Sequence, residues 1–365
     1  MSASDVATDR ATGVSVTGSG SAVPVLWGYR DFWEALPWST RIRVGVRSQL
    51  DRIKFRRRRP LISRIEVTEV GRSRRVPTGE LPLLVVARNE GNRLIPFLRH
   101  YRKLGVTSFF VVDDQSTDGT LDLLLSEPDV RAFTSNVRFG EAKLGEHWRQ
   151  ILAERIGLDR WYVNVDADEF LIYDGMDRHP LPEFIRFLER RRLRRVLAPM
   201  IDMFPAHGIA AAEFDPTREP WEIADRFDAA GNTATRTTLG IVLNGGVRAR
   251  LFGTRGNRSK FPVIFWDRYT LMEQSIHLPL PYWRNFDVPY AALLHFKLFA
   301  DFKERSAEAV ADGQHFMGAR SYRKYVEVLS SGRELALENA DTATFRDSGD
   351  LIRHGFMAPI PWGDS

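Results

Sequence analysis

The strongest constraint on the fold is a pattern that repeats between residues 83 and 198. A short apolar run is followed by a polar break and then by a segment whose apolar residues recur at helical spacing. The predicted strands are residues 83–87, 108–112, 130–134, 161–165 and 196–198. The predicted helices are residues 90–104, 120–126, 142–156 and 181–192. Strands that alternate with helices predict an α/β fold around a parallel sheet with right-handed crossovers.

The two ends of the chain lack this rhythm, so we predict three segments. Residues 1–79 form an N-terminal extension, residues 80–330 the main domain and residues 331–365 a C-terminal tail. Within the extension we predict disorder up to residue 22, followed by one or two short helices that end near Pro60. After about residue 200 the pattern is weaker. The predictions there are a basic loop at 255–260 that separates two strands, and helices at 300–310 and 322–329.

Positive charge is concentrated in the extension. Residues 41–75 contain thirteen Lys and Arg against three acidic residues, a local charge of +10, whereas the whole chain carries +5. An aromatic-rich stretch with Trp27, Trp33 and Trp38 lies just upstream. Aromatic residues followed by a basic run suit peripheral contact with an anionic membrane or an acidic partner. The alternatives are a solvated basic arm, or aromatics that pack onto the main domain. We expect no nucleic acid partner, because the aromatics are not interleaved with the basic run.

The composition excludes several classes of protein. The 365 residues are 43% hydrophobic and 27% charged, which is typical of a globular chain. Cysteine is absent, so neither disulfide bonds nor thiolate metal sites are available. The sequence contains no apolar run of about 18 residues, and residues 1–20 lack the layout of a secretory signal. We therefore expect a cytoplasmic protein, with peripheral contact at the inner face of a membrane as a further expectation from the basic extension.

Polar side chains follow three of the predicted strands at the point where each strand ends. The strand ends are Ala87-Arg88-Asn89-Glu90, Asp113-Asp114-Gln115-Ser116 and Asp166-Ala167-Asp168. In a parallel sheet these ends meet at one edge, where open α/β sheets bind their ligands. The pair Asp166 and Asp168, with Glu169 directly behind, suits a hard divalent cation that keeps positions for water and substrate phosphate oxygens. The residues therefore predict a metal-dependent enzyme that acts on a diphosphate compound.

In order and spacing, these motifs resemble those of family 2-type glycosyltransferases, which have the GT-A nucleotide-sugar-binding fold. The resemblance is to the bacterial branch with an Arg-Asn-Glu start and an Asp-x-Asp-Glu-Phe metal motif, here Asp166 to Phe170. It covers roughly residues 80–200 well and residues 200–330 only loosely. It implies a Rossmann-like, mostly parallel sheet flanked by helices, preceded here by the basic extension. It also implies a hexosyltransferase-type enzyme of polysaccharide biosynthesis, which moves a sugar from a nucleotide-diphosphate sugar to a carbohydrate or glycan-precursor acceptor.

The resemblance assigns roles to the strand-end carboxylates. It implies Mn²⁺ or Mg²⁺ with Asp168 as a direct ligand, and with Asp166 binding the metal or the ribose. At least one of Asp113 and Asp114 is expected to accept hydrogen bonds from the nucleotide base or ribose. For Asp113 and Asp114, and likewise for Asp166 and Asp168, the alternative interpretation is a polar turn that binds no ligand. The turn after Asp114 would then cap the helix that follows it.

The first strand end and two later residues are further candidates. The resemblance places Ala87, Arg88 and Glu90 against the nucleotide, and the planar fork of Arg88 also suits phosphate. The alternative is a surface ion pair at a helix start. His295 is a candidate metal ligand, and the alternative interpretation is a histidine buried in the core with its hydrogen bonds satisfied. Lys260, at the end of the basic loop, is a candidate to hold the diphosphate, and otherwise a solvated side chain.

Glycosyl transfer also needs a general base to assist the acceptor hydroxyl. The resemblance implies inversion at the anomeric carbon with an acidic base beyond the metal motif, but the usual Glu-Asp pair is not found cleanly. The candidates are Asp202, Glu213 and Asp267. Other functions stay open at this point. A nucleotidyltransferase shares the early layout but normally carries a Gly-rich loop after the first strand, and a non-catalytic nucleotide-sugar-binding protein could use the same fold. A metal-dependent phosphohydrolase would need more His and Asp ligands near the metal.

Overall fold

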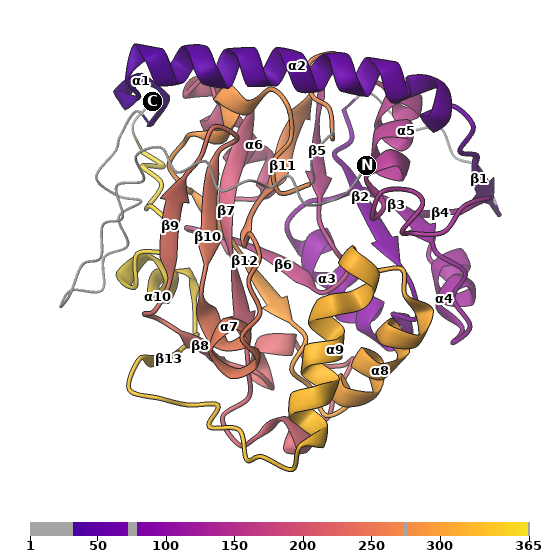
Figure 1. The fold of residues 1–365 in the computed structure, drawn as a ribbon, viewed down its shortest axis with the longest axis vertical. Coiled ribbons are helices and arrows are strands. Elements are labelled where there is room, and N and C mark those ends of the chain that lie inside the picture. The colour runs from indigo at the N-terminus through magenta and orange to yellow at the C-terminus, as the bar shows by residue number, and fades with distance from the viewer. Residues whose placement is uncertain (1–31, 72–78, 273–275, 364–365) are drawn as a thin grey trace.

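The computed structural model describes residues 32–71, 79–272 and 276–363, so the predicted disorder of residues 1–22 and the aromatic Trp27 lie outside the described residues. Its centre is a nine-stranded sheet with the order β1-β4-β3-β2-β5-β11-β7-β12-β6 (Figure 1). In chain order the strands of this sheet are β1 (Val67–Val70), β2 (Pro82–Ala87), β3 (Ser108–Asp113), β4 (Val130–Ser135), β5 (Arg160–Asn164), β6 (Glu169–Tyr173), β7 (Arg195–Met203), β11 (Ser259–Trp266) and β12 (Ala291–Phe296).

The directions of these strands follow from their pairings. Strands β2, β3, β4, β5, β7 and β12 run one way, whereas β1, β11 and β6 run the other way. The sheet is therefore mostly parallel, and the α/β fold class predicted from the sequence is confirmed. Two small antiparallel sheets lie beside it. They pair β9 (Thr233–Arg236) with β10 (Ile241–Asn244), and β8 (Arg226–Asp228) with β13 (Thr342–Thr344).

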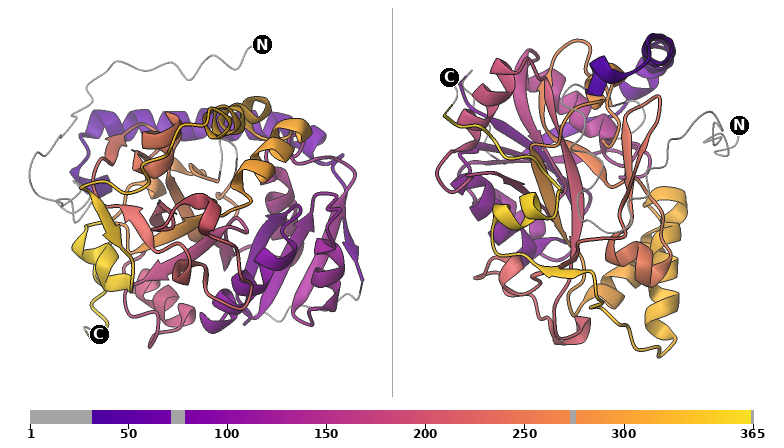
Figure 2. Two further views of the ribbon diagram at one scale, coloured as in Figure 1. Left: turned by 90° about the horizontal axis from the view of Figure 1, so that it is seen from below. Right: turned by 90° about the vertical axis from the view of Figure 1, so that its left-hand side faces the viewer.

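Helices flank the central sheet, as the two views of Figure 2 show. The α-helices are α1 (Phe32–Ala35), α2 (Trp38–Ile62), α3 (Leu94–Lys103), α4 (Thr120–Ser126), α5 (Glu146–Ile156), α6 (Leu181–Arg190), α7 (Gly246–Phe252), α8 (Phe302–Asp312), α9 (Phe316–Ser330) and α10 (Ser348–Arg353). Short 3₁₀ turns are η2 (Gly91–Arg93), η3 (Ile209–Ala211), η4 (Pro220–Glu222) and η5 (Tyr282–Asn285). Over the described ranges, no helix combines the length and the apolar character that crossing a membrane requires.

Strand β2 shows why helices cover both faces of the sheet. Successive residues of a strand point to opposite faces. Leu83 and Val85 belong to the largest apolar cluster, together with Phe97 of α3. Leu84, which lies between them, belongs to a second cluster with Trp148 of α5. A strand that is buried on both faces has a nearly continuous apolar sequence, which is the pattern of residues 83–87.

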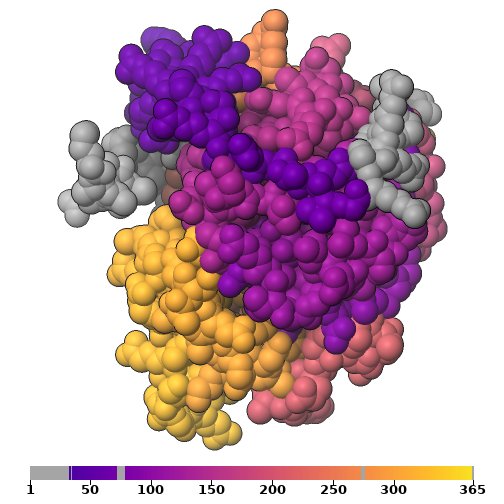
Figure 3. All heavy atoms as spheres, turned by 90° about the vertical axis from the view of Figure 1, so that its right-hand side faces the viewer, coloured from indigo at the N-terminus to yellow at the C-terminus, as the bar shows by residue number. Residues whose placement is uncertain are grey.

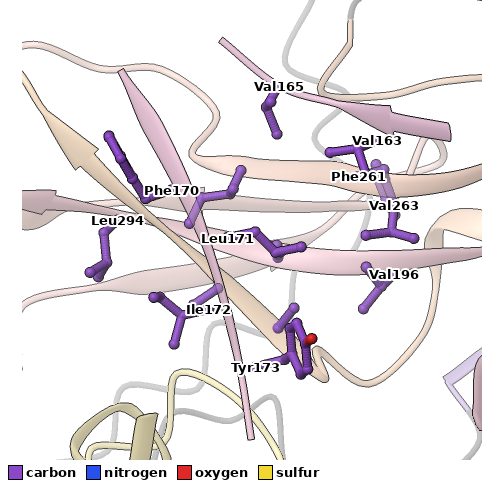
Figure 4. Packing of buried hydrophobic residues seen from close by; sticks show 14 of the residues in the cluster. Val163, Val165, Phe170, Leu171, Ile172, Tyr173, Val196, Phe261, Val263 and Leu294 are labelled. Carbon is purple, nitrogen blue, oxygen red and sulfur yellow. The ribbon is translucent and has the colours of Figure 1, made fainter. Parts of the chain in front are cut away.

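The same core continues through the second half of the sheet. Figure 4 shows buried side chains from β5, β6, β7, β11 and β12 packed in one cluster, and its labels include Val163, Leu171, Val196, Val263 and Leu294. Strand β11 is inserted between β5 and β7 and is antiparallel to both. This insertion decides which residues of β11 lie near the carboxyl ends of the parallel strands.

Three local features differ from the sequence predictions. The segment before residue 80 contains β1, an edge strand that pairs with β4. Strand β6 forms directly after the Asp166 to Asp168 turn, where no strand was predicted. The loop at 255–260 follows helix α7 rather than a strand, and Lys260 itself lies in β11. Short strands depend on pairing and burial against neighbours, which the local sequence does not reveal.

The apolar core extends past both predicted boundaries of the main domain. Val44 and Phe55 of α2 belong to the largest cluster, as do Phe345 and Met357 near the C-terminus. Helix α2 is a single helix of 25 residues that continues past Pro60, where one or two short helices were predicted. The flanking segments therefore pack on the same sheet as the predicted main domain.

Candidate active site

The candidate residues gather at the edge of the sheet where the parallel strands end. In the register of the sheet, the last residue of β2 lies beside the last residue of β3. Asp202 of β7 likewise lies beside His295 of β12, near the ends of these two strands. Strands β11 and β6 run the other way and so bring the residues near their starts, Lys260 and Glu169, to this edge. The antiparallel insertion thus adds a lysine to a group of carboxylates.

Asp166 and Asp168 lie in the turn that joins β5 to β6. The backbone N–H of Asp166 donates to Glu169 Oε2 at 3.0 Å, and the backbone N–H of Glu169 donates to the Asp166 carbonyl at 3.1 Å. The backbone N–H of Phe296, at the end of β12, donates to the Asp168 carbonyl at 3.0 Å. The turn is therefore held by the strand beside it, and both carboxylates have defined positions.

The Asp166 carboxylate lies between two buried cations. It accepts hydrogen bonds from Arg149 Nη2 at 2.6 Å and from Lys260 Nζ at 2.5 Å, and Lys260 Nζ also lies 2.5 Å from Glu169 Oε1. Burial opposes ionisation of Asp166, but Lys260 and Arg149 outweigh it, and the pKa of Asp166 lies well below its ordinary value. The Asp166 side chain is 40% exposed, so an ionised carboxylate is accessible from solvent. Burial raises the pKa of Glu169, which lies behind it.

The Asp168 carboxylate has a separate pair of neighbours. Its Oδ2 accepts from Lys297 Nζ at 2.6 Å and lies 3.3 Å from His295 Nε2. Burial alone would raise the pKa of Asp168, but Lys297 and His295 hold it well below its ordinary value. The pKa of Lys297 is raised, because the attraction of Asp168 exceeds the effect of burial.

Asp202 lies on the other side of His295. Its Oδ1 is 2.6 Å from His295 Nδ1 and accepts from Arg248 Nε at 2.8 Å, and its Oδ2 is 3.6 Å from Arg258 Nε. Burial opposes ionisation, but Arg248, Arg258 and His295 together lower the pKa of Asp202 far below its ordinary value. An ionised carboxylate only accepts hydrogen bonds, so His295 Nδ1 carries a proton and donates a hydrogen bond to Asp202. Asp202 therefore fixes the orientation of the imidazole ring.

Asp168 and His295 are the pair of side chains that fits a divalent cation. With Nδ1 bonded to Asp202, the second ring nitrogen faces Asp168 Oδ2 and either donates a hydrogen bond to it or shares a cation with it. The 3.3 Å separation is close to the roughly 3 Å expected between two neighbouring ligands of one Mg²⁺ or Mn²⁺. Within the described ranges, no three His, Asp or Glu side chains form a complete metal-binding group. Water and substrate phosphate oxygens would have to supply the other positions.

Asp113 and Asp114 have different surroundings at the end of β3. Asp114 accepts from Arg138 Nε at 3.0 Å and from the backbone N–H of Phe139 at 3.2 Å. Asp113 Oδ2 accepts from the backbone N–H of Ser116 at 3.1 Å, which is the turn bond of the alternative interpretation. Asp113 Oδ1 is buried and has no hydrogen-bond partner among the described residues. Asp113 can therefore accept one more hydrogen bond, which makes it the better candidate for nucleotide contact.

Arg88 and Glu90 form ion pairs at the end of β2. Arg88 Nη1 donates to two backbone carbonyls of the segment after β3, at 2.6 and 2.9 Å, and Nη2 lies 3.2 Å from Asp312 of α8. Glu90 accepts from Arg305 Nη2 at 2.6 Å, yet burial keeps the pKa of Glu90 raised. These contacts agree with the ion-pair interpretation. They also attach α8 to the ends of β2 and β3, beside Ala87 and the candidate nucleotide site.

The candidate base Asp267 lies at the opposite edge of the sheet. It follows the end of β11, where Trp266 is paired with Arg160 at the start of β5. Its carboxylate accepts from Arg284 Nη2 at 2.8 Å and from the backbone N–H of Tyr269 at 2.9 Å. An antiparallel strand carries its last residue away from the other candidate residues, so the structure does not bring Asp267 together with them.

Glu213 is the candidate base whose side chain is exposed. It lies in the segment that follows β7, and its side chain faces solvent. The backbone N–H of Ala300 donates to the carbonyl of Ala212 at 3.0 Å, which ties this segment to the residues that follow β12. Asp202, by contrast, is buried behind His295 and cannot reach an acceptor hydroxyl.

Arg149 and Arg248 were missed by the sequence analysis. Arg149 is 1% exposed and lies on the apolar face of α5, so a charged residue within an apolar helical pattern was the available signal. Gly145, which precedes α5, has a φ of +77°, and a Cβ there would lie 2.9 Å from Val86 Cγ2 and 3.1 Å from Arg149 Nη1. Glycine thus allows α5 to approach β2 closely enough for Arg149 to contact Asp166. The sequence around Arg248 in α7 contains no feature that would have marked it as a candidate site residue.

No family model and no curated protein sequence matches this chain. Comparison with solved structures finds weak similarity to a UDP-glucose pyrophosphorylase from Acinetobacter baumanii, with 10% identity, a TM-score of 0.30 and coverage of 68% of this chain and 99% of that one. An inositol-1-phosphate CTP transferase from T. maritima is 12% identical, with a TM-score of 0.24 and coverage of 80% and 100%. An apo UDP-glucose pyrophosphorylase is 10% identical, with a TM-score of 0.22 and coverage of 76% and 96%. Similarity at this level carries no information about the activity of the chain.

Proposed function

We propose that this protein is a metal-dependent glycosyltransferase of the family 2 type, which moves a sugar from a nucleotide-diphosphate sugar to an acceptor hydroxyl with inversion. The observation that carries the proposal is the chain of contacts Asp202–His295–Asp168 at the carboxyl edge of the sheet. It orients one imidazole nitrogen toward an ionised, partly exposed carboxylate, in the position where α/β sheets bind their ligands.

The balance of charge supports a divalent cation in the proposed reaction. Three carboxylates of the site, those of Asp166, Asp168 and Glu169, are already paired with Arg149, Lys260 and Lys297. The formal charges of these six groups cancel. Asp202 with Arg248 and Arg258 behind His295 adds one net positive charge, which is less than the negative charge of a diphosphate that enters alone. A diphosphate that binds with Mn²⁺ or Mg²⁺ brings its own counter-charge.

Each polar residue then has a physical role in the proposed site. Asp168 and His295 would hold the metal ion, which when bound stabilises the negative charge that develops on the leaving diphosphate. Lys260 and Lys297 add fixed positive charge close to the same place, and they need no reorganisation during the reaction. Asp113, with its unpartnered buried oxygen, would accept a hydrogen bond from the base or the ribose.

The acceptor side of the reaction needs an accessible carboxylate as general base. We propose Glu213 for this role, because it is exposed and belongs to the segment tied to the residues after β12. Asp202 instead positions His295, since its carboxylate is buried and already has three partners. This assignment predicts that loss of Asp202 weakens metal and nucleotide binding, whereas loss of Glu213 slows transfer alone.

A nucleotidyltransferase is the main competing proposal, and its products differ from those of glycosyl transfer. The test is incubation of the full-length protein with UDP-, GDP-, dTDP- and ADP-sugars and Mn²⁺, with a glycan-precursor mixture as acceptor. Glycosyl transfer releases a nucleoside diphosphate and requires acceptor. In a parallel incubation with pyrophosphate in place of the acceptor, a nucleotidyltransferase would convert the nucleotide sugar and pyrophosphate into a nucleoside triphosphate and a sugar 1-phosphate.

The variant Asp168→Asn and excess EDTA should each abolish nucleoside diphosphate release. A matched control is Asp267→Asn, an equally ion-paired aspartate at the opposite edge of the sheet, which should retain release. Pyrophosphate exchange with nucleoside triphosphate would refute the proposal in favour of a nucleotidyltransferase. Full release in EDTA would refute its metal dependence.

A further inference from the structure

Helix α2 carries a row of exposed apolar side chains on its outer face. The exposed fractions are 75% for Trp38, 53% for Ile42, 54% for Val46, 52% for Leu50, 46% for Ile53 and 61% for Leu61. We call these six residues the apolar stripe. Helix α2 crosses the top of the molecule in Figure 1 and is seen along its axis at the margin of the fold in the right-hand view of Figure 2. Single exposed apolar residues are common, but a row of six on one helix is typical of an interaction surface.

The stripe lies opposite the side of α2 that packs on the protein. Its residues follow one another at intervals of four, four, four, three and eight, so at 100° per residue they fall within about 140° of one another. The buried residues of the helix fall within about 60° on the other side. These buried residues are Val44, Ser48, Asp51, Phe55 and Ile62. The helix thus carries apolar side chains on two opposite faces, and among the described residues only the inner face packs against the rest of the protein.

Cationic side chains border the stripe on both sides. Between Trp38 and Ile62 the helix carries nine Arg and Lys against one Asp, a net charge of +8, whereas the whole chain carries +5. At helical spacing one border consists of Arg43, Arg47, Lys54 and Arg58, and the other of Arg41, Arg52 and Arg59. Arg56 and Arg57 fall within the stripe itself, between Ile53 and Leu61. Arg47 and Lys54 also pair with Asp51, at 2.8 and 3.0 Å. Long Arg and Lys side chains can extend along an apolar surface and place their charged ends among polar groups.

Contacts on the inner face hold the helix in this orientation. Ser48 Oγ accepts from the backbone N–H of Tyr282 at 3.0 Å, and the Tyr282 hydroxyl donates to Asp51 Oδ2 at 2.9 Å. Near the other end of the helix, Arg59 pairs with Glu154 of α5 at 3.1 Å. Because the contacts of Ser48 and Asp51 are on the buried side, they fix which face of the helix is turned outward. In Figure 3 the first described segment, which includes α2, protrudes from the upper part of the surface.

We infer that the apolar stripe and its cationic borders form a docking surface for an anionic lipid bilayer, with α2 parallel to the membrane plane. An apolar face between rows of Arg and Lys is the layout of helices that lie in the interface between lipid headgroups and acyl chains. The charge complements anionic headgroups, and it disfavours a second copy of the chain, since two such helices of charge +8 would repel each other. The inference does not depend on the proposed function.

Docking through α2 also orients the rest of the molecule. The Arg52 guanidinium lies 4.8 Å from the ring of Tyr269, which follows the end of β11. This is the edge of the sheet opposite the candidate active site, because β11 is antiparallel to β5 and β7. A docked molecule therefore turns its candidate site away from the lipid. If the proposed function holds, the acceptor reaches the site from the aqueous side.

Co-sedimentation of the full-length protein with lipid vesicles tests the inference. We expect binding to vesicles of phosphatidylcholine mixed with phosphatidylglycerol, weaker binding at high salt, and little binding to phosphatidylcholine alone. The variant Arg56→Gln/Arg57→Gln should weaken partitioning roughly thirtyfold, at about a fivefold contribution from each basic residue near an anionic surface. The variant Ile42→Gln/Val46→Gln/Leu50→Gln should weaken it by at least about tenfold through the loss of apolar burial.

Trp38 offers an independent optical signal within the stripe. Its emission should shift to shorter wavelength on anionic vesicles, and this shift should be missing from the variant Trp38→Phe. The control variant is Arg320→Gln/Arg333→Gln, which removes two exposed arginines in and after α9, and it should bind like the wild type. Thermal unfolding checks that every variant is folded, which is expected because all substituted side chains are exposed.

Three results would overturn the inference. The first is the absence of wild-type binding to anionic vesicles. The second is unchanged binding by the triple stripe variant while it remains folded. The third is a concentration-dependent dimer in sedimentation equilibrium that the triple variant abolishes, together with no lipid binding, since a second copy of the chain would then cover the stripe.

Discussion

Replacement of Asp202 by Asn separates a positioning role from a catalytic role for this residue. Asp202 is 3% exposed, and its carboxylate contacts His295, Arg248 and Arg258. Asn has nearly the same shape but carries no charge, so the substitution removes the anionic partner of Arg248 and Arg258. The Asn side chain can also present its NH₂ group to His295 Nδ1, which would reverse the tautomer of the ring.

Two magnitudes follow from these contacts. Breaking a buried charge network by removal of one partner costs about 3–5 kcal/mol of unfolding free energy. Removal of the carboxylate that orients a metal-binding histidine commonly weakens metal affinity about 10- to 100-fold. We therefore expect Asp202→Asn to be less stable in urea unfolding and to bind a nucleoside diphosphate with Mn²⁺ about 10- to 100-fold more weakly in calorimetry.

The matched control is Asp267→Asn. Asp267 is also buried and ion-paired, with Arg284, but it lies at the opposite edge of the sheet. Its replacement should lower stability and leave nucleotide binding with Mn²⁺ unchanged. If Asp202→Asn bound nucleotide and Mn²⁺ like the wild type while losing sugar transfer, Asp202 would be the general base and the positioning role would be refuted.

The pH dependence of stability gives a second test of Asp202. The pKa of Asp202 is lowered in the folded protein relative to about 3.9 in an unfolded chain. The folded state thus binds fewer protons at acid pH, so the stabilisation is complete above about pH 4 and is lost as the pH falls toward the folded pKa. The difference in unfolding free energy between wild type and Asp202→Asn should therefore shrink below about pH 4. A difference that stayed constant from pH 7 to pH 3 would contradict the ion-pair account.

Three further predictions concern the other candidate residues. Asp168→Ala should lose Mn²⁺-dependent nucleotide binding and sugar transfer by at least about 100-fold, and unchanged activity would exclude Asp168 as a ligand. Asp113→Ala should weaken nucleotide binding measured by calorimetry about tenfold or more, whereas Asp114→Ala should mainly lower stability because Arg138 loses one of its two carboxylate partners; equal binding by both would leave this strand end as a turn. Glu213→Gln should retain nucleotide binding but slow transfer about 10²- to 10⁴-fold, and wild-type transfer rates would remove Glu213 from the mechanism.

The local sequence was sufficient to predict the first half of the sheet. Residues 83–87 and 108–112 are continuous apolar runs because both of their faces are buried, and each is followed by polar residues that begin a connection. Parallel strands bring such ends together whatever the rest of the chain does, so the common edge for Asp113 and Asp166 was also predictable. These predictions rest on residues that are close in sequence to the strands they describe.

The partners of the candidate residues were decided by the tertiary structure alone. Asp202 and His295 are 93 residues apart, and Lys260 and Asp166 are 94 residues apart. Their contacts depend on where β11 and β12 enter the sheet, and on β11 being antiparallel. That direction brings Lys260 to the site and sends Asp267 to the opposite edge. No periodic pattern within β11 records its direction, because a buried strand has the same apolar sequence in either orientation.

Helix α2 shows the same division between sequence and structure. The aromatic and basic composition of residues 23–59 indicated an interaction segment, and it also allowed a solvated arm or a segment packed on the fold. Which side of the helix is buried was settled only by the contacts of Ser48 and Asp51 with Tyr282, more than 200 residues away in the chain. Both faces of α2 are apolar, so periodicity alone could not distinguish them. Local sequence determines that a helix forms, whereas only packing determines which of two similar faces is left exposed.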